Sequence, residues 1–225
     1  MDDYSTISKL MQDGTFQDLS PQLRTAIFIG GMAFLSSMLV TMTAFTRIVI
    51  VLSFTRRALS TQEIPPTQVI IGLAMFLTFF VMGPTVQNIE SNALRPYLEE
   101  EINGVDAWMR SADELRLFML RQTRTQDLQL FLEMAQAEKP SAAEDTPMRV
   151  LIPAFVISEL KTAFIMGFCL YLPFVLVDLV VSVILMALGM MMMPPVIIST
   201  PCKILLFILV DGWSLIAKAL SMSFN

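Results

Sequence analysis

Histidine is absent from this chain of 225 residues. Without an imidazole the chain has no histidine general base, no Ser-His triad and no histidine metal ligand. No motif for another nucleophile is recognisable. The sequence therefore predicts a protein that is not an enzyme and that uses no metal and no cofactor.

Cysteine and charged residues are also scarce. The two cysteines, Cys169 and Cys202, lie in apolar runs, and their spacing fits neither a zinc site nor a disulfide framework. We expect both to be small buried hydrophobic residues. Charged residues make up 16% of the chain, against roughly 25% in soluble domains. The net charge of -5 argues against a nucleic-acid-binding surface.

Apolar residues are abundant where charged residues are scarce. The chain is 55% hydrophobic, which is a membrane-type composition, and its pattern predicts an all-α fold. Four parts follow from the pattern: a polar N-terminal segment at residues 1–24, a first apolar helical hairpin at 25–89, an acidic helical soluble insert at 90–149 and a second apolar helical hairpin at 150–225. The N-terminal segment lacks the basic and apolar regions of a signal peptide.

The first hairpin is expected from two apolar runs, residues 26–54 and 64–89. Each run exceeds the roughly 20 residues that cross a bilayer as a helix. In the insert, helical spacing predicts amphipathic helices at 112–124 and 125–137, followed by a loop. We interpret the insert as a connecting domain without chemistry of its own.

The second hairpin contains an unusually long apolar run. As one helix, residues 152–190 would be about 60 Å long, which is twice the hydrocarbon thickness of a bilayer. Pro173 lies in the middle of this run and is expected to kink or break it. The run ends at a turn that separates it from a last apolar stretch.

Four consecutive methionines mark this turn: Met190, Met191, Met192 and Met193 lie between Gly189 and the pair Pro194 and Pro195. Methionine is flexible and polarizable, so it adapts to different surfaces. At a turn the four side chains would point in several directions, and a ring of copies would form an apolar collar that resists ions by dewetting. The alternative is that they are ordinary core or lipid-facing residues.

Six charges interrupt the apolar runs: Arg47, Glu159, Lys161, Asp178, Lys203 and Asp211. A charge at bilayer depth costs at least ~2.5–3.5 kcal/mol on insertion scales, so such groups face protein partners or water. Glu159 and Lys161 are two positions apart and lie on different helix faces, so each needs its own partner. Ion pairs between subunits are the favoured interpretation. An intrachain pair of Asp178 with Lys203 and a proton relay of the transporter kind are the alternatives.

Orientation follows from the basic residues. Arg56 and Arg57 lie in the first connector, whereas the N-terminus and the insert are acidic. The positive-inside rule places this connector on the cytoplasmic side. The insert and both termini are then expected on the periplasmic side, with the methionine tip pointing inward.

Several segments resemble the FliP family of flagellar biosynthetic export-gate proteins, which are related to the SctR proteins of virulence type III secretion. They are LPFVLVDLVVS at 172–182, GMMM at 189–192 with the following Pro-Pro, KILLF at 203–207 and VDGW at 210–213. In the first half, FTRI at 45–48 and GLAMFLT at 72–78 are similar as well. The resemblance extends from about residue 24 onward.

This resemblance implies an inner-membrane protein of the flagellar basal body. Family members form a pentamer that joins FliQ and FliR, with FlhB and FlhA nearby, around a channel for unfolded flagellar proteins. Their helices are packed in a cone and largely lifted out of the bilayer. The loop matching Met190, Met191 and Met192 is a gasket, and the helices matching Glu159 and Lys161 pack between subunits. Met193 departs from the expected Leu or Val.

Two other functions remain open at this point. A virulence secretion system could use the same kind of gate subunit. A proton-coupled secondary transporter could use Glu159 and Asp178 as proton sites, although the few apolar segments and the lack of an inverted repeat argue against it.

Overall fold

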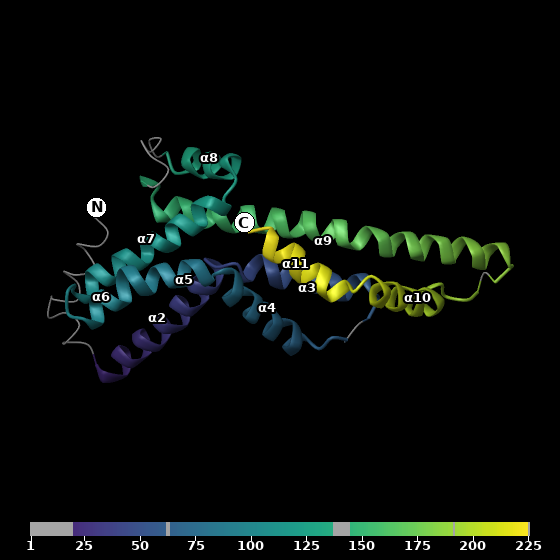
Figure 1. The fold of residues 1–225 in the computed structure, drawn as a ribbon, viewed down its shortest axis with the longest axis horizontal. Helices are drawn as coiled ribbons and strands as arrows, with labels where there is room; N and C mark the ends of the chain where they lie inside the picture. Colours follow the sequence, from purple (N-terminus) through teal and green to yellow (C-terminus); the bar gives the residue numbers. More distant parts are fainter. Residues whose placement is uncertain (1–19, 62–63, 137–144, 191, 225) are drawn as a thin grey trace. The chain divides into compact units, whose positions relative to one another are not determined.

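The structure is a computed structural model that describes residues 20–61, 64–136, 145–190 and 192–224. Across these ranges the chain is helical and contains no β-strand, which confirms the predicted class (Figure 1). The helices are α2 (Pro21–Thr41), α3 (Phe45–Ala58), α4 (Thr67–Val81), α5 (Gly83–Ile89), the π-helical turn η2 (Glu90–Leu94), α6 (Arg95–Leu98), α7 (Gly104–Gln122), α8 (Thr125–Met134), α9 (Met148–Ala187), α10 (Val196–Leu209) and α11 (Gly212–Met222).

The chain divides into two compact units, residues 1–40 and 41–225. Helix α9 organises the second unit, because α3, α7, α8 and α10 all pack against it (Figure 1). The first part of α9 and the facing side of α3 form the core of this unit. Its fully buried apolar side chains include Ile48, Val51, Leu52, Leu151 and Phe155.

Gly167 allows α3 to approach α9 closely. A Cβ atom at this position would lie 2.7 Å from the ring of Phe54 on α3, which is too close for a real contact. The ring of Phe54 also meets Phe164 edge to face, at 5.5 Å between ring centroids. A small residue on α9 therefore lets an aromatic side chain of α3 seat against it.

Helix α9 continues through Pro173, so of the two expected effects, a kink or a break, the break is wrong and the kink stays a prediction. Its 40 residues form one helix with Pro153 and Pro173 inside it. Proline removes one backbone hydrogen bond, but packing against neighbouring helices offsets such a loss in apolar helices. Here Phe174 is buried, and Asp178 pairs with a residue of α10, so contacts on the C-terminal side of Pro173 hold the helix in place.

The other apolar runs are interrupted instead. Residues 26–54 form two helices, α2 and α3, because the chain leaves the helical path at 42–44, where Thr43 Oγ1 accepts a hydrogen bond from the Phe45 N–H at 3.4 Å. Helix α4 meets the segment Gly83–Leu98, which contains α5, η2 and α6, at a bend of 60°, and α10 and α11 meet at a bend of 64°. The second bend lies at Asp211, whose φ of 49° is left-handed.

Among the described residues, only a few segments are therefore long enough to cross a membrane. Over the described residues, α9 is the one helix that is long and apolar enough to cross a membrane alone. Each of the two bent pairs would add a further crossing if it passed through the membrane as a unit, which gives up to three.

The insert is helical, as predicted, with shifted boundaries. Helix α8 begins at Thr125, the expected start, and ends at Met134. Helix α7 begins at Gly104, eight residues before the expected start at 112, because the Asn103 side chain accepts a hydrogen bond from the Asp106 N–H at 2.9 Å and caps the helix. Most of the expected loop after α8 lies outside the described residues.

The expected burial of the two cysteines is wrong. Cys169 and Cys202 are both exposed and both free. They lie on helices whose outward faces are themselves apolar, so an apolar sequence around a cysteine marks an apolar surface here and not a core.

Candidate functional site: the buried charges and the methionine tip

A buried ion pair joins α3 to α9. Arg47 of α3 is 2% exposed and Glu159 of α9 is fully buried. Arg47 Nε donates to Glu159 Oε2 at 2.8 Å, and Arg47 Nη2 donates to Glu159 Oε1. This two-pronged geometry matches the planar guanidinium to the planar carboxylate, and lysine cannot reproduce it.

The remaining donors of Arg47 bind two other segments. Nη1 donates to the Ser223 carbonyl oxygen at 2.7 Å and to Ser223 Oγ at 3.0 Å, and Nη2 also donates to Gln122 Oε1 at 3.2 Å. The Phe224 ring lies 3.8 Å from the guanidinium carbon, in cation–π contact. All N–H groups of a buried guanidinium thus have acceptors.

We call Arg47, Glu159, Gln122, Ser223 and Phe224 the arginine centre. It connects α3, the end of α7, α9 and the residues after α11. Gln122 Nε2 donates to the Phe224 carbonyl oxygen at 3.0 Å, which ties the C-terminal residues to α7 as well as to α3. A single buried charge pair therefore fixes segments that are far apart in the sequence.

Lys161 has a different partner from Glu159, as the spacing of these residues predicts. Its ammonium group pairs with Asp127 in the first turn of α8. Asp127 is buried, whereas half of the Lys161 side chain is exposed. The two neighbouring charges of α9 therefore attach α9 to two separate elements, α3 and α8.

Asp178 and Lys203 form the third pair, between α9 and α10. Lys203 Nζ lies 2.5 Å from Asp178 Oδ2 and donates to Ser60 Oγ at 2.7 Å. Lys203 is buried, and Asp178 is partly exposed. This is the intrachain pair that the sequence left as an alternative to pairing between subunits.

The five charges other than Asp211 thus each have a partner inside the chain. Pairing between subunits is not needed to neutralise them, and a role for these residues in assembly stays a prediction. Glu159 and Asp178, the carboxylates that a proton relay would use, are both engaged by cations.

The methionine tip is the turn between α9 and α10. Gly189 follows the end of α9 with φ of +79°, a left-handed value that glycine adopts without strain. The Met190 N–H donates to the Leu185 carbonyl oxygen at 2.9 Å and closes the helix end. Pro194 and Pro195 come directly before α10.

The side chains of this tip face outward. Met192 is 98% exposed, while Met190 and Met193 are exposed at 40% and 38%. Met191, the remaining methionine of the predicted site, lies outside the described residues. A fully exposed thioether side chain at a turn has no packing role within this chain.

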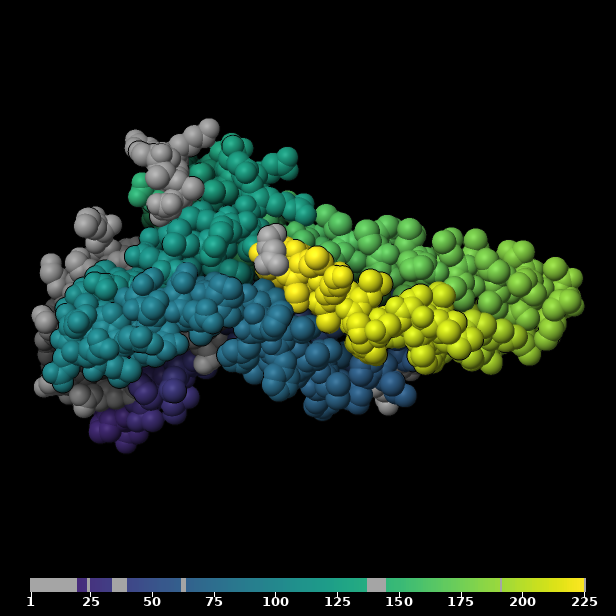
Figure 2. Space-filling view, viewed as in Figure 1, coloured from purple at the N-terminus to yellow at the C-terminus, as the bar shows by residue number. Residues whose placement is uncertain are grey.

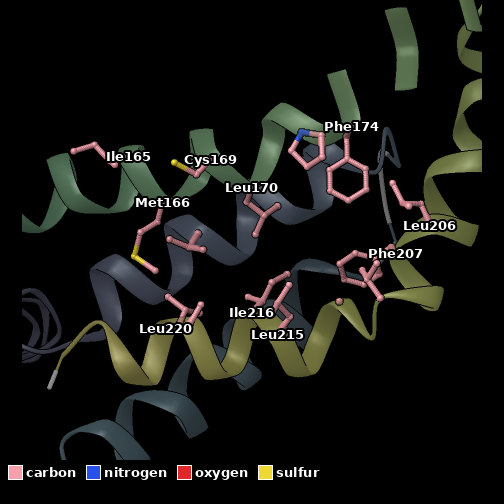
Figure 3. A pocket seen from close by; sticks show the side chains of 15 residues that line it. Ile165, Met166, Cys169, Leu170, Phe174, Leu206, Phe207, Leu215, Ile216 and Leu220 are labelled. Carbon is pink, nitrogen blue, oxygen red and sulfur yellow. The ribbon is translucent and has the colours of Figure 1, made fainter. Parts of the chain in front are cut away.

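An apolar cavity of about 590 Å³ lies between α9, α10 and α11 (Figure 3). Figure 3 shows Cys169 and Leu170 on one wall and Leu215 and Ile216 on the opposite wall, with Phe207 at one end. No group of three or more metal-ligating side chains occurs in the part of the chain that the structure describes. Neither the cavity nor the charges form a catalytic arrangement.

Several residues of these sites could not be found from the sequence. The charged residues of the apolar runs have five polar or aromatic partners: Gln122, Ser223, Phe224, Asp127 and Ser60. Each lies outside the apolar runs or at their ends, where a polar residue is unremarkable. The single available signal was the need of each buried charge for a partner.

The fold and the site define a membrane-type helical protein held together by internal ion pairs, with an exposed methionine turn. Comparison with known families gives a more specific result: the model of the FliP family matches residues 28–220. The chain therefore belongs to the FliP family, and the resemblance in its motifs is confirmed.

Its relatives include proteins named flagellar biosynthetic protein FliP. The one from Bacillus subtilis (strain 168) is 48% identical over 208 residues, which cover 92% of this chain and 94% of that protein. The one from Aquifex aeolicus is 46% identical over 210 residues, covering 92% and 88%. The one from Buchnera aphidicola subsp. Acyrthosiphon pisum is 48% identical over 218 residues, and this chain spans 57% of its length.

Proposed function

We propose that this chain is a core subunit of the flagellar type III export gate. Several copies, five by the family resemblance, would combine with FliQ, FliR, FlhB and FlhA type subunits in the inner membrane at the flagellar basal body. Together they would form a channel for unfolded flagellar proteins. The main support is the exposed methionine turn in a chain that belongs to the FliP family.

In this proposal the methionine tip closes the channel. The two helices that carry the tip, α9 and α10, pack against each other in this chain (Figure 2). Copies arranged around an axis would bring Met190, Met192 and Met193 of each subunit together. A narrow apolar constriction resists ions by dewetting, and flexible methionines can yield to a passing polypeptide.

The exposed apolar surfaces favour an assembly or a lipid environment. Large side chains such as Phe168, Leu179 and Ile208 are more than half exposed in the single chain. Contiguous apolar patches of this kind mark protein or membrane contacts. Helices α9 and α10, which carry these side chains, would present them to neighbouring subunits or to lipid.

The internal ion pairs fit a subunit that folds before it assembles. Since Arg47, Glu159, Asp178 and Lys203 are already paired, these four charges need no partner from a neighbouring subunit. The orientation expected from Arg56 and Arg57 places the first connector on the cytoplasmic side and the insert and termini on the periplasmic side.

The alternatives have less support. The relatives at 46–48% identity carry flagellar names, which favours a flagellar gate over a virulence one. A proton-coupled transporter would need carboxylates free to exchange protons, whereas Glu159 and Asp178 are held by cationic partners.

The copy number tests the proposal. The chain, coexpressed with FliQ and FliR type partners and purified in mild detergent, is expected to give a complex with five copies of the chain in a native mass measurement. A chain that stays monomeric while both partners are present and folded contradicts the gate proposal.

A further inference from the structure

A second cleft lies along α9, beside the residue that precedes α8. It has a volume of about 490 Å³, and its lining combines two cations with an apolar floor: Arg124, Lys161, Ile157, Leu160, Phe164 and Ile165. None of these cations belongs to the methionine tip or to the arginine centre. Such a lining suits a ligand with one anionic and one hydrocarbon part.

The cleft carries a net positive charge. Lys161 is paired with the buried carboxylate of Asp127, which neutralises one of its two cations. Arg124 Nη2 donates to the neutral hydroxyl of Thr162 at 3.1 Å, and among the described carboxylates none forms an ion pair with Arg124. One positive charge is therefore left for a ligand that carries one negative charge, as a phosphodiester does.

The position of the cleft along α9 indicates what the ligand is. From Phe164 to Leu188, α9 exposes large apolar side chains. This stretch is about 36 Å long at 1.5 Å per residue, which is slightly more than the hydrocarbon core of a bilayer. Lys161 lies one turn before this stretch, and Arg124, beside it in the cleft, directly precedes helix α8. With this stretch of α9 inside the hydrocarbon core, both cations would lie at the level of the lipid head groups.

We propose that this cleft binds an anionic phospholipid, with Arg124 contacting the phosphodiester and the floor of Leu160, Phe164 and Ile165 contacting an acyl chain. Arginine suits this role because its planar fork recognises phosphate with two N–H groups. The proposal concerns the chain before assembly, when no neighbouring subunit covers α9. It rests on the membrane placement in the proposed function and not on the channel or the methionine tip.

Native mass measurement of the detergent-purified full chain, titrated with phosphatidylglycerol or phosphatidylcholine, tests this proposal. Phosphatidylglycerol is expected to bind the wild type more tightly. Arg124→Gln is expected to weaken that binding about tenfold, because a charge-assisted contact is lost. Arg121→Gln is the matched control, since Arg121 is an exposed arginine at the end of α7 that does not line the cleft. It should bind as the wild type does.

Three results would overturn the lipid site. They are equal binding of the two lipids, equal losses in both variants, and full displacement of phosphatidylglycerol by water-soluble glycerol phosphate, which would mean that the anion alone is recognised. The melting temperature of both variants without lipid shows that they remain folded. A failure here leaves the copy number of the gate unchanged, so the two proposals are tested separately.

Discussion

Replacing Met190, Met192 and Met193 with alanine is expected to make the proposed export gate leak ions in its closed state. Alanine shortens each side chain to one methyl group, so a constriction built from these residues widens and becomes wet. We expect the ion flux through the resting gate to rise about tenfold or more, which corresponds to a barrier lowered by roughly 1.4 kcal/mol. The measurement is the conductance of the assembled complex in planar bilayers.

Two control variants separate the apolar seal from other effects. Leucine at the same three positions conserves apolar volume and should keep the gate closed. Met134→Ala changes an exposed methionine on α8, away from the tip, and should leave the conductance unchanged. If the triple alanine variant assembles fully and conducts no more than the wild type, the methionine tip does not close the channel.

Replacing Arg47 with methionine is expected to be the most destabilising single change in the chain. Glu159 would stay buried without its cation, and breaking a buried pair in this way costs about 3–5 kcal/mol. Ser223 and Gln122 would lose their donor at the same time. Arg47→Lys should also destabilise the chain, because an ammonium group cannot bind both carboxylate oxygens and Ser223 together.

The free energy of unfolding of the single chain in mild detergent provides the measurement. Arg95→Met is the matched control, because Arg95 forms an exposed pair with Glu90, and such pairs contribute about 1 kcal/mol or less. The double variant Arg47→Met with Glu159→Leu should recover part of the loss, since no buried charge remains. Equal effects of Arg47→Met and Arg95→Met would show that the arginine centre does not hold the chain together.

The helical class and the tip were accessible from the sequence, because apolar run length and turn residues are local signals. The position of a break is not such a signal. Pro173 predicts a break in the helix because proline lacks the backbone N–H that would donate a helical hydrogen bond. Contacts made by Phe174 and Asp178 nevertheless keep α9 continuous. The bend at Asp211 instead depends on one left-handed backbone conformation that its residue type permits but does not demand.

The partners of the charges were the least predictable feature. Arg47 and Glu159 are 112 positions apart, and Arg47 and Ser223 are 176 positions apart. The cost of burying a charge predicts that a partner exists, but the identity of the partner depends on how α3, α7 and α9 pack. The predicted burial of the two cysteines was wrong for a related reason. Composition alone does not distinguish a helix face that is buried in the core from an apolar face that is exposed on the surface.

Disulfide cross-linking at Met192 tests most directly whether the tips of several copies meet at one axis. In a chain with Cys169→Ser and Cys202→Ser, both exposed cysteines are removed, and Met192→Cys supplies a single thiol at the most exposed tip position. The proposed gate predicts covalent dimers of Met192→Cys within the assembled complex and none for Met134→Cys. Assemblies of full mass in which Met192→Cys forms no dimers would contradict it.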